Sequence, residues 1–310
     1  MGQCTNSIML IRPVCFRYNE ETATNNYYQQ VLDSLSPEQV QSHALQEFND
    51  FVSVLQSAGV NVVVFEDTKT PVTPDSIFPN NWVSFHSDGR VCMYPMYAKN
   101  RRVERRSDIL ASLKTDHGFT VKEIVDYSTL ENHDVYLEGT GSMVLDRANK
   151  ICYAAISERT HKAALEQFCN DFEYGLITFT AYQSFEGNRL PVYHTNVMMS
   201  VGDSFAVVCL DSIDDLDERI GVLDSLLATG KEIIELTEAQ VHQFAGNMLQ
   251  VIGDESCVFM STSAYHSLEE WQISSIEKHR IILHSSLDTI EACGGGSARC
   301  MMAEVFLPRQ

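Results

Sequence analysis

Five polar residues recur along the chain at nearly equal spacing, and this regularity constrains the fold more than any other feature. They are Asn81, Glu138, His194, Asn247 and Cys300, separated by 53 to 57 residues. A period of this size is typical of repeat architectures. If every repeat presents the same point of its structure to one axis, the five side chains meet there. We therefore expect a thiol, an imidazole and a carboxylate to converge from distant segments, which is the set that a cysteine nucleophile needs.

Each period contains the pattern of a hairpin, a helix and a closing strand. In the first complete unit two apolar segments flank Asp88-Gly89, a strong signal for a hairpin turn. The other predicted hairpin turns are Asp146 to Lys150, Gly202-Asp203 and Gly253-Asp254. The predicted helices are Asn100 to Leu113, Glu158 to Phe172, Ile213 to Leu227 and Ser267 to Lys278. The predicted closing strands are Phe119 to Ile124, Leu176 to Thr180, Glu232 to Leu236 and Arg280 to His284. The repeat is therefore expected to be ββαβ.

The two ends of the chain are expected to form the fifth unit together. Ile8 to Val14 is a predicted strand, a capping box at Ser36-Pro37-Glu38-Gln39 begins a helix, and Val60 to Phe65 is a second strand. Cys300 to Phe306 is predicted to be one strand that pairs with the first, which closes a ring and removes sheet edges. We predict a single α/β domain over residues 1–310, a five-bladed pseudo-symmetric propeller. An ordinary two-domain α/β protein with coincidental spacing is the alternative.

Composition limits the partners of this chain. Its net charge of −20 argues against binding to nucleic acid or to anionic membranes. There is no apolar run near the ~20 residues that span a bilayer and no basic, apolar leader at the N-terminus. Nine irregularly spaced cysteines are typical of reduced thiols in a cytoplasmic protein. Histidines and cysteines lack metal-ligand spacing, so we expect neither a metal nor another cofactor.

Local sequence supports three of the periodic residues as catalytic. Cys300 follows a run of three glycines, and the backbone of Gly295 and Gly296 could approach a ligand closely and donate N–H groups to a developing negative charge. Glu138 lies between an apolar segment and two glycines, an unusual position for a surface carboxylate. We predict Cys300 as the nucleophile, His194 as the general acid and base, and Glu138 as the group that orients His194.

Four motifs carry a resemblance to a known family. GGGSARCM around Cys300, LEGTG around Glu138, HTN from His194 and SERT around Arg159 resemble the motifs of the arginine deiminase and amidinotransferase superfamily, the pentein fold. The resemblance spans nearly the whole chain. It implies a five-bladed α/β propeller, a buried axial site with a Cys, His and Glu set, and no metal. It also implies that Arg159 binds the substrate α-carboxylate. A second arginine for that carboxylate could be any of Arg101, Arg102, Arg105 and Arg106.

The sequence departs from this family at two positions that usually carry Asp. These positions are Asn81 in Phe78-Pro79-Asn80-Asn81 and Asn196 in His194-Thr195-Asn196. A buried guanidinium needs carboxylate partners, whereas a neutral ureido group needs both donors and acceptors, which carboxamides supply. The two asparagines therefore predict binding of a ureido substrate such as citrulline. In this respect the chain resembles the citrulline-hydrolysing relatives in the family.

The predicted function is a cysteine-dependent hydrolase of a small amino acid, converting citrulline to ornithine and carbamate through an S-carbamoyl intermediate. An arginine or methylarginine deiminase and an amidinotransferase are the enzymatic alternatives. A binding protein of the same fold without catalysis is a further alternative, and the presence of Cys300, His194 and Glu138 argues against it. The sequence leaves the oligomeric state open, a homo-oligomer included.

Overall fold

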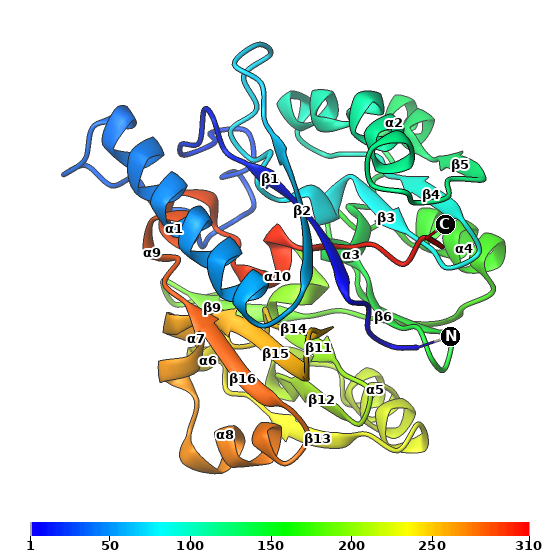
Figure 1. The fold of residues 1–310 in the computed structure, drawn as a ribbon. Helices are drawn as coiled ribbons and strands as arrows, with labels where there is room; N and C mark the ends of the chain where they lie inside the picture. The colour runs from blue at the N-terminus through cyan, green and yellow to red at the C-terminus, as the bar shows by residue number, and fades with distance from the viewer. Residues whose placement is uncertain (1, 310) are drawn as a thin grey trace.

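A computed structural model describes residues 2–309, in which strands form five three-stranded sheets of one topology (Figure 1). In each sheet an antiparallel pair is extended by a third strand parallel to the middle one, and a helical segment precedes that third strand. The four sheets formed by consecutive strands are β3 (Val83–Phe85), β4 (Arg90–Met93) and β5 (Glu123–Asp126); β6 (Val144–Asp146), β7 (Ile151–Ala155) and β8 (Gly175–Phe179); β11 (Met199–Val201), β12 (Phe205–Val208) and β13 (Glu232–Glu235); and β14 (Leu249–Ile252), β15 (Ser256–Ser261) and β16 (Ile281–Ser285). The ββαβ repeat and all four hairpin turns are confirmed.

The fifth sheet joins the two ends of the chain. Strand β1 (Ser7–Arg12) pairs in parallel with β2 (Asn61–Glu66) and antiparallel with β17 (Ala303–Glu304). The predicted pairing is confirmed, but the prediction of one strand over 300–306 is wrong. Residues Ala298–Met301 form the helical turn α10 instead. The physical reason is that the N–H groups of Arg299 and Cys300 donate to the side chain of Asn247, not to a neighbouring strand.

The helices of the repeats cover the sheets. Their bounds are α1 (Pro37–Ser57), α2 (Ser107–Thr115), α4 (Lys162–Phe172), α5 (Leu216–Ala228) and α8 (Glu270–Glu277), with shorter helices α6 (Glu238–Val241), α7 (Thr262–Ser267) and α9 (Asp288–Gly294). Helix α1 begins where the sequence predicts, whereas α2, α4, α5 and α8 begin later. Short 3₁₀ turns are η2 (Lys99–Glu104), η3 (Ser128–His133) and η5 (Leu210–Ser212). The predicted helix over 100–113 is divided between η2 and α2. Helix α5 starts at Leu216 because the Asp215 side chain caps the N–H groups of Asp217 and Glu218.

Helix α1 shows how local sequence fixes one element. Ser36 accepts a hydrogen bond from the Gln39 N–H, and the Gln39 side chain accepts one from the Ser36 N–H, as the capping box predicts. The predicted apolar stripe is buried, and Phe51 meets Phe259 of β15 with ring centroids 4.9 Å apart. Burying each such ring stabilises the fold by roughly 1.5–3 kcal/mol. Gly59, at φ 80°, ends the segment in a left-handed conformation that favours glycine.

Two local features differ from the sequence prediction. Closing strand β5 begins at Glu123, because Phe119 forms an isolated bridge with Arg309 near the C-terminus. A hairpin of β9 (Tyr182–Phe185) and β10 (Asn188–Pro191) was not expected. It turns at Gly187, at φ 78°, and lies outside the five repeats.

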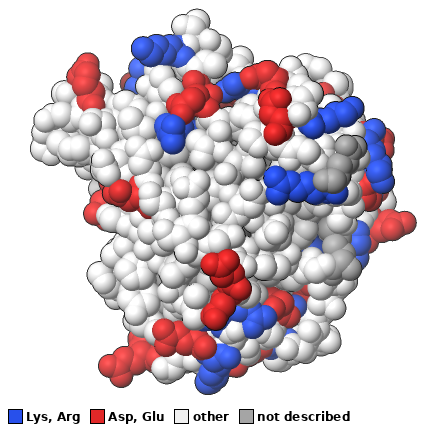
Figure 2. All heavy atoms as spheres, viewed as in Figure 1, with Lys and Arg blue, Asp and Glu red and all other residues white. Residues whose placement is uncertain are grey.

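Charged side chains do not form a large field of one sign on the face in Figure 2. Lys and Arg are interspersed with Asp and Glu around the edge of this face, and its centre is largely free of charged side chains. Among residues 2–309, no helix has both the length and the apolar character that crossing a membrane requires. In the same part of the chain, no group of three or more His, Cys, Asp or Glu side chains is placed to hold a metal ion.

Short helical turns bring four of the five periodic residues together. These turns are η1 (Pro79–Asn81), α3 (Gly139–Ser142), η4 (Thr195–Val197) and α10, and each directly precedes the first strand of a sheet. Turn α3 contacts η1 and η4, and α10 contacts η1. Figure 1 shows α3 and α10 in the middle of the molecule, between the upper and lower sheets. A Cβ at Gly139 would lie 2.3 Å from the Asn80 carbonyl oxygen, so glycine is required for this close packing.

Candidate active site

A small polar cavity lies where the helical turns meet. It is lined by Asn26, Asp75, Phe78, Asn81, Arg101, Arg159, Tyr193, His194, Gly294, Gly295, Gly296 and Cys300. Six of the eight residues predicted for the site line this cavity. The other two lie directly behind its lining: Glu138 contacts His194, and Asn196 contacts Cys300. The structure therefore brings all eight residues to one place.

His194 and Glu138 form a fully buried pair. The Nε2 atom of His194 lies 2.8 Å from Oε2 of Glu138. Burial lowers the pKa of His194 to about 4, although the Glu138 carboxylate opposes this shift. Burial alone would raise the pKa of Glu138, but the charge of Arg159 and the contact with His194 outweigh it and hold this pKa at about 2. Near neutral pH the pair is therefore a carboxylate and a neutral imidazole whose Nε2–H donates to it, which leaves Nδ1 as the basic nitrogen.

The sulfur of Cys300 contacts two carboxamides. Nδ2 of Asn247 lies 3.2 Å from Sγ, and Nδ2 of Asn196 lies 3.5 Å from it. Among the described residues these are the N–H groups that donate to the sulfur, and His194 is not one of them. The support for a thiolate in this structure therefore comes from the two carboxamides, and not from a hydrogen bond to His194. The sequence identified Asn247 by its period but gave it no role.

Arg159 lies between the cavity and a segment near the N-terminus. Its Nε donates to Oδ1 of Asn25 at 2.8 Å, and its Nη2 donates to the carbonyl of Thr22 at 2.7 Å. Its Nη1 lies 3.5 Å from Oε2 of Glu138. The guanidinium is thus fixed by three oxygen atoms and remains part of the cavity wall. No sequence signal placed residues 22–26 at the site, because they belong to a segment without regular periodicity.

Arg101 is the one of the four alternative arginines that lines the cavity. Its Nη1 donates to Oδ1 of Asn81 at 2.8 Å, and its Nε and Nη2 donate to the buried carboxylate of Glu104. Because a guanidinium only donates, the Asn81 oxygen must face Arg101 and the Asn81 amide nitrogen must face away from it. That nitrogen donates to Oδ1 of Asn80 at 3.1 Å.

The glycine run approaches the cavity closely, as predicted, but one of its predicted donors is used elsewhere. The N–H of Gly295 donates to the carbonyl of Glu291 and ends α9, with Gly295 at φ 60°. The carbonyl of Gly295 accepts hydrogen bonds from Asn26 and from the hydroxyl of Tyr193. A Cβ at Gly296 would lie 3.0 Å from Phe78, so the run allows close packing of the loop against the wall.

Asp75 is a cavity residue that sequence reasoning missed. Its Oδ2 accepts hydrogen bonds from Asn19 at 2.7 Å and Thr22 at 3.0 Å, and it lies 3.8 Å from Nε of Arg101. Its Oδ1 is buried and accepts no hydrogen bond from the described residues. Burial raises the pKa of Asp75, although Arg101 opposes the shift. An acceptor of this kind is available to a ligand that carries N–H groups.

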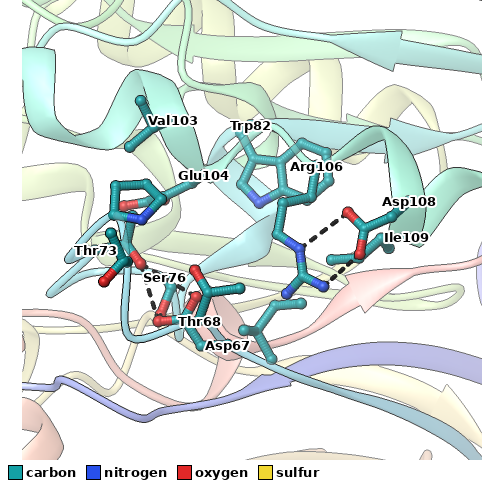
Figure 3. Close-up of a pocket in the computed structure, with 13 residues that line it drawn as sticks. Asp67, Thr68, Thr73, Ser76, Trp82, Val103, Glu104, Arg106, Asp108 and Ile109 are labelled. Carbon is teal, nitrogen blue, oxygen red and sulfur yellow. Dashed lines mark hydrogen bonds and ion pairs between the residues drawn. The ribbon is translucent and has the colours of Figure 1, made fainter.

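A second cavity, of about 340 Å³, lies on the other side of Glu104 and contains none of the predicted catalytic residues (Figure 3). Figure 3 shows Asp67 accepting hydrogen bonds from Thr73 and Ser76 on one side, and Arg106 paired with Asp108 on the other. Glu104 lines this cavity and also holds Arg101, so it separates the second cavity from the catalytic one. The acidic groups of this second cavity are satisfied internally, and we assign no chemistry to it.

A buried cysteine, histidine and glutamate at the meeting point of ββαβ repeats define a protein of the pentein superfamily. The family model described as N,N dimethylarginine dimethylhydrolase, eukaryotic, matches residues 12–307. The chain belongs to this family, and the resemblance inferred from the motifs is confirmed at the level of the superfamily. No curated protein matches the sequence.

Solved structures of low sequence identity share the mixed α/β fold. The apo structure of ArgZ, an arginine dihydrolase from the ornithine-ammonia cycle in cyanobacteria, is 16% identical with a TM-score of 0.72, over 98% of this chain and 41% of that chain. Unliganded AgrE is 17% identical with a TM-score of 0.74, and the match covers 98% of this chain and 40% of that chain. This chain therefore spans about two fifths of both proteins. A histidine-to-glycine variant of a dimethylarginine dimethylaminohydrolase, as an adduct with S-methyl-L-thiocitrulline, is 14% identical with a TM-score of 0.64. The match covers 96% of this chain and 98% of that chain.

Proposed function

We propose that the protein is a cysteine-dependent hydrolase that cleaves a C–N bond of a ureido or guanidino amino acid, with citrulline as the preferred substrate. The observation that carries this proposal is the pair of carboxamides, Asn81 and Asn196, beside a cysteine that shares a cavity with a histidine. The proposal includes the arrangement of the five sheets as the blades of one propeller in a single domain over residues 1–310.

The charges of the cavity favour a zwitterion with a neutral head group. Two guanidinium groups, Arg101 and Arg159, face the cavity with the single carboxylate of Asp75. We assign the substrate α-carboxylate to Arg159 and the α-ammonium group to the unpartnered Oδ1 of Asp75. A cationic guanidinium head would then find no free carboxylate, because Asp75 binds the ammonium group and Glu138, behind the lining, already pairs with His194 and Arg159.

The orientation of Asn81 supports a head group with an oxygen. Arg101 fixes the Asn81 oxygen on its own side, and one amide N–H of Asn81 donates to Asn80, so the second amide N–H remains for the substrate. A ureido oxygen accepts such an N–H, whereas a guanidinium has only donors. Asn196, beside the sulfur, offers both an N–H group and an oxygen.

The proposed chemistry uses one proton carrier for two steps. Neutral His194 takes the thiol proton as the Cys300 sulfur attacks the ureido carbon, and the resulting imidazolium protonates the leaving ornithine nitrogen as the C–N bond breaks. An S-carbamoyl enzyme remains. His194 then takes a proton from water, which adds to the carbamoyl carbon, and cleavage of the C–S bond releases carbamate and restores the cysteine. Glu138 stabilises the imidazolium in both steps.

A second candidate function is hydrolysis of arginine or a methylated arginine. It is favoured by the names of the relatives, since ArgZ is called an arginine dihydrolase and the matching family is named for dimethylarginine.

All nine cysteines of the chain are free thiols, which fits the proposed cytoplasmic location.

The test is a product analysis with matched variants. The purified protein is incubated with citrulline, arginine and N,N-dimethylarginine, and ornithine, citrulline, ammonia and dimethylamine are quantified. Ornithine from citrulline, lost in Cys300→Ala and retained in Cys293→Ala, is the expected result. Rapid release of dimethylamine from dimethylarginine, with no ornithine from citrulline, would replace the first proposal by the second.

A further inference from the structure

We propose that Asn247 is a further catalytic residue, whose carboxamide N–H stabilises the thiolate form of Cys300. This inference depends on the proposed function only in taking Cys300 as the nucleophile. Asn247 is fully buried in the loop before β14, and its Nδ2 lies 3.2 Å from the sulfur.

The orientation of the Asn247 carboxamide is fixed by its other partners. Its Oδ1 accepts the backbone N–H of Arg299 at 3.0 Å and that of Cys300 at 3.3 Å. Only the oxygen of a carboxamide accepts hydrogen bonds, so the amide nitrogen must lie on the opposite side. One N–H of this nitrogen donates to the carbonyl of Asn196 at 2.9 Å, and the second donates to the sulfur.

The loop around Asn247 is held rigidly. A Cβ at Gly246 would lie 2.3 Å from the carbonyl oxygen of Val197, so η4 and this loop pack too closely for any residue but glycine. Asn247 therefore links the turn that carries His194 and Asn196 to the turn that carries Cys300. Such a group cannot move away from the sulfur when the charge on the sulfur changes.

The donor favours the charged form of the sulfur. A neutral thiol is a weak acceptor, whereas a thiolate accepts strong, charge-assisted hydrogen bonds. Because Asn247 and Cys300 are buried, bulk water does not compete for this contact. His194 supplies no positive charge in the resting state, because burial keeps its pKa at about 4. The carboxamide donors thus carry out the stabilisation that an imidazolium provides in other cysteine enzymes.

The remaining charged and titratable groups that face the sulfur are unchanged in an Asn247 variant. They are Tyr193, His194, Arg101, Arg159 and Asp75 around the cavity, with Arg299 adjacent along the chain. A change in the pH dependence of Cys300 alkylation in such a variant therefore reports the loss of the amide.

The experiment measures the pH dependence of Cys300 alkylation by iodoacetamide. Trypsin releases residues 300–309 as a peptide whose one cysteine is Cys300, and residues 281–299 as a peptide whose one cysteine is Cys293. Mass spectrometry of the two peptides gives the rate at the candidate nucleophile and at an internal reference, since burial raises the pKa of Cys293. The proteins compared are wild type, Asn247→Ala, Asn247→Asp and Gln250→Ala. Gln250→Ala removes another buried carboxamide from β14.

The pH of half-maximal alkylation should rise by about one unit or more in Asn247→Ala, the size expected for a hydrogen bond to a charged group. It should rise further in Asn247→Asp, which keeps the acceptor for the backbone N–H groups but places a carboxylate against the sulfur. In Gln250→Ala the pH of half-maximal alkylation should equal that of wild type. Turnover of citrulline by Asn247→Ala should fall at neutral pH through kcat and recover in alkaline buffer.

Two results would overturn the proposal: an unchanged midpoint of Cys300 alkylation in both Asn247 variants, or a thiolate absorbance of Cys300 with the same pH dependence in both variants as in wild type. Asn247→Asp is isosteric, so it keeps the test valid if Asn247→Ala does not fold. Ultraviolet thiolate absorbance, taken as the difference between each protein and its Cys300→Ser counterpart, provides a reading that needs no reagent access. A protein that fails to convert citrulline but shows the shift contradicts the proposed function and leaves this inference standing.

Discussion

His194 and Glu138, 56 residues apart in the sequence, are joined by a buried contact of 2.8 Å between Nε2 and Oε2. The two residues come from different repeats, each at the start of a short helical turn. The contact assigns Nε2 as the protonated nitrogen and leaves Nδ1 for proton transfer. It also places a negative charge where the imidazolium forms, so the same carboxylate both orients the ring and stabilises its charged state.

Replacing Glu138 with Gln should lower kcat for the preferred substrate by at least about 100-fold, because a carboxamide can neither impose this tautomer nor balance the imidazolium charge. Steady-state kinetics check this prediction, with thermal unfolding to verify the fold. Glu131→Gln is the control, since Glu131 is also a largely buried, paired carboxylate but binds Arg105 outside the cavity. A kcat within threefold of wild type in Glu138→Gln would contradict the role of the pair.

The regular spacing of polar residues was sufficient to predict the repeat, the pairing of the chain ends and five of the residues that gather at the site. The reason is physical: a ββαβ unit of constant length returns the chain to the same position relative to its neighbours, so one residue per unit can be located by counting. The same reasoning was wrong about the element that carries Cys300. A strand and a short helical turn can both contain apolar residues over four positions, and the side chain of Asn247 decides between them.

The residues that the sequence did not reveal are those without a periodic position. Asn26 lines the cavity and Asn25 binds Arg159, both from an irregular segment, and Asp75 lines the cavity from a proline-containing loop. Their contacts depend on tertiary packing between segments that are distant in the sequence. The sequence named Arg101 as one of four candidates for the second substrate-binding arginine but could not choose among them. Only the fold shows that Arg105 pairs with Glu131 and that Arg106 pairs with Asp108.

Exchanging the carboxamides for carboxylates should change substrate preference. In Asn81→Asp the new carboxylate would pair with Arg101 and offer no N–H group to a ureido oxygen, so kcat/KM for citrulline should fall by about 10- to 100-fold, the size of one lost hydrogen bond. Asn196→Asp should act in the same direction and raise the ratio of arginine to citrulline turnover. Competition assays with both substrates check this. Asn188→Asp, on the exposed β10, is the control, and an unchanged ratio in both site variants would contradict the carboxamide argument.

Gly141 should tolerate no side chain. A Cβ there would lie 2.4 Å from Nδ2 of Asn81 and 2.8 Å from Nδ1 of His194. Gly141→Ala should therefore displace both groups and reduce kcat/KM by more than about 100-fold, since small misplacements of catalytic groups cost this much. Gly221→Ala is the matched control: Gly221 lies in α5 with open space around its Cβ position, and the change should stabilise the protein by about 0.5–1 kcal/mol. Kinetics and denaturation curves distinguish the two effects.

The buried, neutral state of His194 should make stability depend on pH in a defined window. The unfolded chain binds a proton at His194 as the pH falls through about 6.5, whereas the folded protein does not until about 4. The free energy of unfolding should therefore be constant above pH 6.5 with respect to this group, and should decrease by up to about 3 kcal/mol as the pH falls towards 4. Urea denaturation at several pH values measures the slope.

In His194→Gln this slope should become shallower without vanishing, because burial also lowers the pKa of His86 well below its usual value. His86 bonds Ser84 outside the catalytic cavity, so His86→Gln should remove its own part of the slope and retain activity. Of the four proteins, the double variant should show the smallest change in the free energy of unfolding between pH 6.5 and 4. If His194→Gln and wild type have the same slope in this range, then His194 binds its proton at about the same pH in the folded protein as in the unfolded chain. That result would contradict the lowered pKa of the buried ring.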